Sequence, residues 1–224
     1  MMPTLYVVAT PIGNLSDMTP RAIETLKRVA LIAAEDTRVT LKLLNHLGLK
    51  KPMTTYHRHN TQQAGRGILD RLISGESCGL VTDAGTPAIS DPGEDLVALC
   101  HEKGIPVGVV PGPTAVTAAL ALAGMPTGRF TFEGFLTVNK KSRRERLESL
   151  KNEERTMIFH EAPHKLLATL EDMSQVFGAD RPISLCRELT KLHEEVVRTT
   201  LGGAIAKYTE TPPKGEFVLV LDGA

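Results

Sequence analysis

The sequence of 224 residues contains no tryptophan and only three tyrosines. A surface that binds single-stranded nucleic acid by stacking its bases depends on aromatic side chains, so this composition argues against such a platform. An excess of charge is also lacking, because 26 lysines and arginines balance 26 aspartates and glutamates. Any contact with nucleic acid must therefore come from a local basic patch.

Cysteine is scarce as well. Cys78, Cys100 and Cys186 are an odd, scattered set without a CxxC pair, which argues against a metal site or a disulfide framework. The apolar runs are too short for a membrane span, and the start, MMPTLYVVATP, lacks the features of a signal peptide. We therefore expect a cytoplasmic protein with no metal site and no membrane contact.

Two phosphate-binding patterns are absent too. No GxGxxG follows the first apolar run, and no GxxxxGK occurs in the chain. These loops hold dinucleotides and nucleoside triphosphates, so their absence argues against a nicotinamide or nucleoside-triphosphate cofactor.

Short apolar runs alternate with helical patterns in the first half of the sequence. This alternation with short loops predicts a parallel sheet with helices on both faces. Asp91, followed by a proline and then by Glu94, is predicted to cap a helix. The predicted strands cover residues 4–9, 31–36, 53–57, 78–82 and 105–110.

The pattern changes near residue 126. Residues 129–136 form a predicted strand with alternating phenylalanines, and the remainder has more neighbouring strands than the first half. We therefore predict two α/β domains, an N-terminal one with a parallel sheet over residues 1–126 and a C-terminal one over residues 127–224.

Three loops follow predicted strands of the first half, at residues 10–19, 82–93 and 111–115. Open α/β sheets bind ligands at the carboxyl ends of their strands, and glycine there lets a ligand approach the backbone. Ordinary strand-to-helix turns are the alternative interpretation. Together the loops favour a small-molecule site, and Asp83 suits a ligand with hydroxyls, an amine or a positive centre.

The letters HEAPH, residues 160–164, match the HExxH pattern of zinc proteases. That pattern needs both histidines on one face of a continuous helix. Pro163 would break such a helix, so we predict that it starts a new helix and that His160 and Glu161 end a strand.

Charged clusters allow two interpretations each. Glu35 and Asp36 could divide acid and base roles, or Asp36 could cap a helix and pair with Arg38. The run KKSRRER, residues 140–146, carries five basic residues against one acid. It could be a solvated helix face or a patch that neutralises RNA phosphates.

Six ordered segments carry a resemblance to a known family. LYVVATPIGNLSDMT, LIAAEDTR, VTDAGTPAISDPG, VVPGPTAVTAAL, FEGFL and CRELTK resemble the markers of the ribosomal small-subunit RNA methyltransferase I branch of the tetrapyrrole (corrin/porphyrin) methylases. The resemblance spans about Leu5 to Leu221. It implies two α/β domains with the cofactor in the cleft between them, S-adenosylmethionine as methyl donor, and a homodimer. The implied substrate is the ribose 2′-oxygen of a decoding-region cytidine in 16S ribosomal RNA, within the small ribosomal subunit.

The resemblance also implies which residues bind the cofactor. It places two loops of the first domain and one strand of the second around S-adenosylmethionine, with a late segment near the adenine. One departure is Ala162, where family members more often carry serine or threonine. The implied cofactor-binding residues are Thr82, Asp83, Ala84, Gly85, Thr86, Pro111, Gly112, Pro113, Thr114, Phe132, Gly134, Phe135, Gly215 and Glu216.

A base near the ribose hydroxyl should assist the reaction. Asp83 is our first candidate for that base, and Glu35, Asp36 and Glu161 are its rivals. The basic residues expected to face RNA are Arg38, Arg58, Lys140, Lys141, Arg143 and Arg144.

Two other functions fit the same features. One is a methyltransferase that acts on a ring carbon of a corrinoid or porphyrin, although the loop at residues 9–19 and the basic run argue against it. The other is a non-catalytic RNA-binding or ribosome-assembly factor whose pocket has lost its activity.

Overall fold

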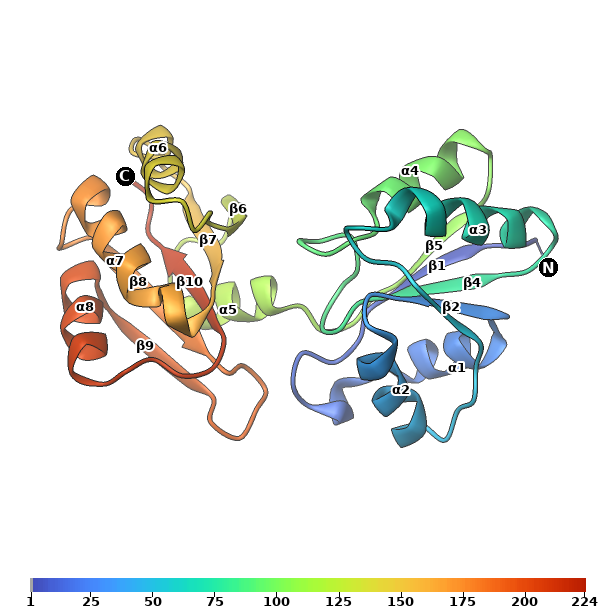
Figure 1. Ribbon diagram of the computed structural model, residues 1–224. Helices are drawn as coiled ribbons and strands as arrows, with labels where there is room; N and C mark the ends of the chain where they lie inside the picture. Colours follow the sequence, from blue (N-terminus) through green and yellow to red (C-terminus); the bar gives the residue numbers. More distant parts are fainter. Residues whose placement is uncertain (1) are drawn as a thin grey trace. The chain divides into compact units, whose positions relative to one another are not determined.

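The computed structural model describes residues 2–224. The chain forms two compact units, Met1–Thr114 and Ala115–Ala224, which we call the first and the second unit. Each unit has one five-stranded sheet with helices packed against it (Figure 1). The prediction of two α/β domains therefore matches the architecture of the chain.

The sheet of the first unit is entirely parallel. Its strand order is β3-β2-β4-β1-β5, and Leu5 of β1 pairs with Cys78 of β4 on one side and with Val107 of β5 on the other. All four residues of β2 and of β4 are buried, as expected for parallel strands covered on both faces. The strands are β1 (Leu5–Val8), β2 (Leu31–Ala34), β3 (Met53–Thr55), β4 (Cys78–Val81) and β5 (Val107–Val110).

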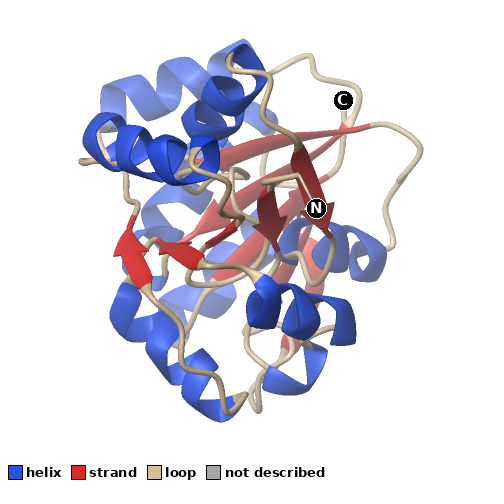
Figure 2. Ribbon diagram, turned by 90° about the vertical axis from the view of Figure 1, so that its right-hand side faces the viewer, coloured by secondary structure: helices blue, strands red, loops and turns tan. Residues whose placement is uncertain are grey.

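Helices cover both faces of this sheet, as Figure 2 shows. Successive strand residues point to opposite faces, so Ile32 packs in a core with α1 and α2, whereas Ala33 packs in a core with α3 and α4. The helices are α1 (Pro20–Arg28), α2 (Thr37–His46), α3 (Thr61–Ile73) and α4 (Glu94–Glu102), with a 3₁₀ turn η1 (Leu15–Asp17).

The strand order creates a topological switch point between β2 and β4. The chain leaves β2 through α2 toward one edge of the sheet and leaves β4 through α4 toward the other. Because these two neighbouring strands send their connections to opposite faces, their carboxyl ends are where an open α/β sheet binds a ligand.

The helix starts follow local rules with one correction. Thr19 caps α1 and Pro20 occupies its first turn, where proline is well accepted. Asp91 does not cap α4, because the helix begins only at Glu94 with Gly93 as its N-cap. Gly93 has a φ of 149°, and a Cβ there would lie 2.9 Å from Cδ2 of Leu80, so glycine is required at the turn.

The sheet of the second unit is mixed. Its order is β6-β7-β10-β8-β9, with β6 parallel to β7 and the other neighbours antiparallel. A register shift between Phe132 and Gly134 marks a bulge in β6. The strands are β6 (Phe130–Phe135), β7 (Thr156–Glu161), β8 (Pro182–Arg187), β9 (Glu195–Thr200) and β10 (Phe217–Leu221).

Three helices and α5 cover opposite faces of this sheet. Helices α6 (Lys140–Ser149), α7 (Pro163–Phe177) and α8 (Leu201–Glu210) share one core with β7, β8 and β10. Helix α5 (Ala115–Ala123) packs against β8 and β10, and Sγ of Cys186 lies 3.8 Å from the carbonyl oxygen of Ala119.

Helix α5 therefore belongs to the second unit, whereas the sequence placed the boundary between residues 126 and 127. The alternation of strands and helices continues through α5, so the sequence pattern gives no sign that this helix packs on the next sheet. Among the described residues, every helix is too short or too polar to cross a membrane.

Candidate functional site

The three loops of the first unit meet at Gly85. The backbone N–H of Thr10 donates to the carbonyl oxygen of Gly85 at 2.8 Å, and the N–H of Gly85 donates back at 3.1 Å. A Cβ on Gly85 would lie 3.4 Å from Cγ2 of Ile12 and 3.9 Å from the carbonyl oxygen of Pro113. The loops after β1, β4 and β5 are thus brought together at one sheet edge.

The switch point itself holds two of the predicted acids. The hydroxyl of Thr82, which follows β4, donates to Oε2 of Glu35, which follows β2, at 2.6 Å. The backbone N–H of Asp36 donates to Oδ1 of Asp83 at 3.1 Å. Glu35 and Asp83 therefore lie beside each other, and Asp83 is exposed.

Burial, and after it the crowding of carboxylates, raises the pKa of Asp83 and of Asp91. Partial burial, followed by the charge of Glu35, raises the pKa of Asp83. Burial and the same charge raise the pKa of Asp91 to about 6. Asp91 was predicted only as a helix cap. Its place in this group could not be found from sequence, because it depends on how the loop 82–93 folds back toward β2.

Asp36 instead caps a helix and pairs with Arg38, which is the second interpretation of the acidic pair. Its Oδ1 caps α2 by accepting from the backbone N–H of Arg38 at 2.8 Å, and its carboxylate pairs with the guanidinium of that arginine at 2.6 Å. Hydrogen bonds from Arg38 lower the pKa of Asp36 to about 2, so this group is a poor base.

The loop 82–93 is strained. Ala88 and Ser90 have φ values of 67° and 65°, in the left-handed region that non-glycine residues avoid. The guanidinium of Arg58, from the turn after β3, donates to the carbonyl oxygen of Ser90. The predicted RNA-facing arginines Arg38 and Arg58 are both exposed and both hold parts of this sheet edge.

The predicted residues of β6 lie at the bulge. Gly134 has a φ of 66°, and Phe135 is 56% exposed. The ring of His160 on β7 contacts Phe132 and Phe135 edge-on, with centroids 5.1 and 5.2 Å apart. Sequence reasoning placed His160 at a strand end but missed this contact, which arises from the parallel register of β6 and β7.

Burial lowers the pKa of His160, so its imidazole is neutral near pH 7. Its Nε2 is buried without a hydrogen-bond partner among the described residues. The neutral ring of His160 therefore packs against the exposed ring of Phe135.

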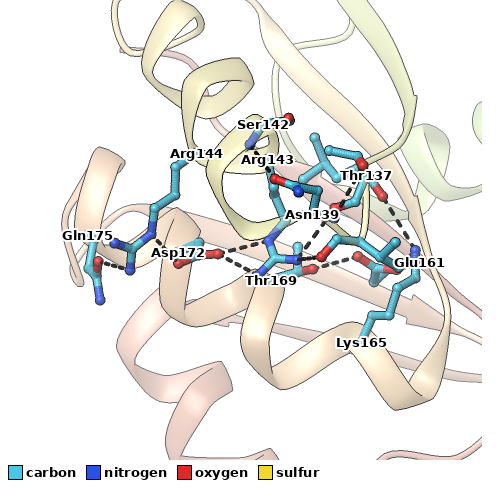
Figure 3. A network of polar contacts seen from close by, with 12 residues as sticks. Thr137, Asn139, Ser142, Arg143, Arg144, Glu161, Lys165, Thr169, Asp172 and Gln175 are labelled. Carbon is cyan, nitrogen blue, oxygen red and sulfur yellow. Dashed lines mark hydrogen bonds and ion pairs between the residues drawn. The ribbon is translucent and has the colours of Figure 1, made fainter.

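Glu161, predicted as a rival base, belongs to an internal network (Figure 3). Its Oε1 accepts from the N–H of Ala162 at 2.8 Å and pairs with Nζ of Lys165 at 2.8 Å, while Oε2 accepts from the hydroxyl of Thr169 at 2.6 Å. Its side chain is 1% exposed. This carboxylate is committed to structure, which corrects its assignment as a candidate base.

The strand-end prediction for the HEAPH segment is confirmed. His160 and Glu161 end β7, and Pro163 opens α7 after the N-cap Ala162. The two histidines of the pattern therefore lie on different elements.

Arg143 was predicted to face RNA, and the structure corrects this prediction. Its side chain is 7% exposed and pairs with Asp172, which is 2% exposed, at 2.6 Å (Figure 3). Arg144 also binds Asp172, at 2.7 Å, but remains 40% exposed. Lys140 and Lys141 are exposed at the start of α6.

An open hollow of about 710 Å³ lies over the same helix. The basic surface that the structure supports is therefore smaller than predicted. The residues that line the hollow are Lys140, Lys141, Arg144, Glu145 and Glu148.

Gly215 and Glu216 precede β10 and contact Glu188. The N–H of Glu216 donates to Oε1 of Glu188 at 2.9 Å, and Lys191 bridges both carboxylates at 2.8 Å. Gly215 has a φ of 81°, and a Cβ there would lie 2.4 Å from Cγ of Glu188. The close approach explains why glycine occupies this position.

Comparison with known proteins gives matches along most of the chain. The model of the family described as Tetrapyrrole (Corrin/Porphyrin) Methylases matches residues 4–205. A ribosomal RNA small subunit methyltransferase I from Synechocystis sp. is 55% identical over 100% of this chain and 80% of its own length. A protein of the same name from Thermotoga maritima is 46% identical over 99% of both.

Solved structures agree on the fold. Uroporphyrin-III-C-methyltransferase from Thermus thermophilus gives a TM-score of 0.67 over 98% of this chain and 94% of that one, at 18% identity. At this level of identity the likeness concerns the fold alone.

Proposed function

Because this chain belongs to the ribosomal RNA small subunit methyltransferase I family within the tetrapyrrole (corrin/porphyrin) methylases, we propose that it methylates 16S ribosomal RNA with S-adenosylmethionine. The proposed acceptor is the ribose 2′-oxygen of a cytidine in the decoding region. The observation that carries the proposal is the identity of 46–55% over almost the whole chain.

The residues of the first unit fit such a cofactor. S-adenosylmethionine has a positive sulfonium, an amine and ribose hydroxyls, and the carboxylates at the switch point complement positive charge. Gly85 and Gly112 allow the loops after β4 and β5 to pack closely on the loop after β1, since a Cβ on Gly112 would lie 3.0 Å from Cβ of Ala9. The residues proposed to hold the cofactor are those given above, 82–86, 111–114, Phe132, Gly134, Phe135, Gly215 and Glu216.

When bound, the cofactor supplies an electrophilic methyl carbon. The residues of the chain must align the ribose oxygen with that carbon, and alignment alone can contribute about 7–11 kcal/mol. We assign Asp83 as the base that accepts the proton of the 2′-hydroxyl, because it is exposed and its raised pKa favours proton uptake. Partial burial, and after it the neighbouring charge of Glu35, sustains this pKa, and the hydroxyl of Thr82 holds Glu35 in place.

We assign the RNA contacts to Arg38, Arg58, Lys140, Lys141 and Arg144, which all reach solvent, whereas Arg143 is left out because it is buried. Neutralised phosphates make such binding salt-dependent. The proposed partner is the small ribosomal subunit, which places the protein in the cytoplasm. Family membership also leads us to propose a homodimer.

The deciding experiment combines binding and product analysis. Calorimetry should detect S-adenosylmethionine binding, and mass spectrometry should find a 2′-O-methylcytidine that disappears from 16S RNA of a strain lacking the gene. Asp83→Asn should lose turnover even at saturating cofactor, because the base would be missing; near-normal turnover would remove Asp83 as the base. An absent binding signal would indicate an assembly factor with an inactive pocket, and methylation of a porphyrin in place of RNA would move the chain to the other branch of the family.

A further inference from the structure

Cations from α6 and α7 hold the turn that follows β6. The carbonyl oxygen of Leu136 accepts from Nζ of Lys165 at 3.4 Å. The carbonyl oxygens of Thr137 and Val138 accept from Nη1 of Arg143 at 3.4 and 3.3 Å. Three consecutive carbonyls directly after Phe135 are thus bound by two side chains (Figure 3).

Both cations are themselves fixed by buried carboxylates. Glu161 holds Lys165 at 2.8 Å, and Asp172 holds Arg143 at 2.6 Å. The two carboxylate side chains are only 1% and 2% exposed, so they cannot exchange these partners for water. The turn is therefore tied to the core of the second unit rather than left to move as an exposed loop.

Lys165 differs from Arg143 because it also contacts an aromatic side chain. Its Nζ lies 5.5 Å from the centroid of the Phe135 ring, within the range of a cation–π contact. His160 packs edge-on against the same ring at 5.2 Å. Phe135 is 56% exposed, and the contacts with Lys165 and His160 help to define where its ring stands.

We propose that Lys165 is a positioning residue for cofactor binding, acting through Phe135. It fixes the backbone after the bulge of β6 and the face of the ring, so that the ring is in place before the ligand arrives. This inference rests on the proposed function, in which Phe135 contacts S-adenosylmethionine. Lys165 does not act on the reacting atoms, so its loss should weaken binding rather than slow the methyl transfer.

The competing explanation is that Lys165 only forms a structural ion pair with Glu161. Two variants distinguish this structural role from the positioning role. Lys165→Met keeps the length of the side chain but leaves Glu161 buried without its cation, which can destabilise the fold. Glu161→Gln combined with Lys165→Met removes both charges, and a buried pair replaced as a whole is often tolerated. The double variant therefore reports on position without an unpaired buried charge.

The control is Lys207→Met. Lys207 has the same combination of contacts elsewhere in the second unit, because its Nζ lies 5.6 Å from the ring of Tyr208 and 2.5 Å from Oε1 of Glu195. It reports what the loss of one lysine with an ion pair and a cation–π contact does to the protein in general.

The test is calorimetry with S-adenosylmethionine and steady-state methylation of 16S RNA by the full chain. We expect the double variant to bind the cofactor about tenfold more weakly, with kcat at saturating cofactor within about twofold of the wild type. Lys207→Met should bind like the wild type. In a Phe135→Ala background, Lys165→Met should cause no further loss, because the two act as one unit.

Wild-type affinity in the double variant would overturn the proposal, as would additive losses from Phe135→Ala and Lys165→Met. Failure of the wild-type protein to bind S-adenosylmethionine would instead overturn the proposed function. If Lys165→Met alone does not fold, the double variant still decides the question.

Discussion

The hydroxyl of Thr82 and the carboxylate of Glu35 are joined by a 2.6 Å hydrogen bond that links the carboxyl ends of β4 and β2. These are the two strands at the topological switch point of the parallel sheet. Thr82 is 3% exposed, so the bond lies at the base of the candidate site rather than on its surface.

Removing this hydroxyl should destabilise the first unit. In Thr82→Val the Glu35 carboxylate loses its short donor while the volume of the side chain is kept, and we expect a loss of about 1–2 kcal/mol in the free energy of unfolding. Thr25→Val is the matched control. Its buried hydroxyl donates to the carbonyl of Arg21 within α1, so its removal leaves no charge without a donor. Equal losses in urea titrations of both variants would contradict this role of Thr82.

The sequence predicts the features of this site that depend on local patterns. Short apolar runs identify the parallel strands, and their loops must lie at one edge because parallel strands end together. Pro163 separates β7 from α7 because proline is accepted at a helix start and not inside one.

Features that depend on distant partners could not be predicted in the same way. Arg143 stands in a basic run, yet it is buried because Asp172 approaches it from α7. One sign was available, since Arg143, Leu147 and Leu150 are spaced by four and three residues and share the buried face of the segment. The composition of a run says less about its exposure than its helical periodicity does.

The raised pKa of Asp91 predicts a pH dependence of stability. The folded protein binds this proton with a pKa of about 6, against 3.8 for the ordinary value. Below pH 3.8 the Asp91 carboxyl group is mostly protonated in the folded and the unfolded state and does not change the free energy of unfolding. Above pH 6 its charge is less favourable in the folded protein, so the free energy of unfolding falls as the pH rises between these values. Asp91→Asn should gain about 1–2 kcal/mol over the wild type between pH 4 and pH 7, after allowance for solvent screening.

Asp36→Asn is the control for this measurement. The lowered pKa of Asp36, about 2, means that its stabilising contribution is present above pH 3.8 and is lost only as the pH falls toward 2. Between pH 4 and pH 7 the difference between Asp36→Asn and the wild type should stay constant. A constant difference for Asp91→Asn as well, in urea unfolding at both pH values, would show that Asp91 has no raised pKa.

Loss of Arg143 should be severe. Arg143→Met leaves the buried Asp172 with only the half-exposed Arg144, and breaking a buried pair from one side costs about 3–5 kcal/mol. Arg155→Met breaks a pair with Glu153 in which the arginine is 41% exposed, and it should shift the urea midpoint far less, because solvent screens this pair. Similar urea midpoints for the two variants would show that Arg143 is exposed to solvent and does not form a buried ion pair.

Ala162 offers a stabilising substitution. It is the N-cap of α7, with φ −86° and ψ 147°, and it provides no side-chain hydrogen bond to the first turn. Ala162→Ser supplies a hydroxyl for that turn and should raise the free energy of unfolding by about 1 kcal/mol. Ala168→Ser, at an exposed position inside the same helix, should lower it slightly because serine is the poorer helix former. If both serines lower the thermal midpoint, the backbone N–H groups in the first turn of α7 already have other hydrogen-bond partners.

The basic surface at the start of α6 predicts the salt dependence of RNA binding. Lys140 and Lys141 are exposed, and the 3.9 Å contact of Lys141 with Glu145 is too exposed to hold it strongly. Each lysine that contacts a phosphate contributes about 1 to the slope of log affinity against log salt. Lys140→Gln with Lys141→Gln should therefore make the slope for 16S RNA shallower by about 2, at unchanged stability. Lys42→Gln with Lys103→Gln removes the same charge from exposed positions of the first unit and should leave the slope in place. Equal slopes for the two double variants would show that Lys140 and Lys141 make no specific contribution to RNA binding.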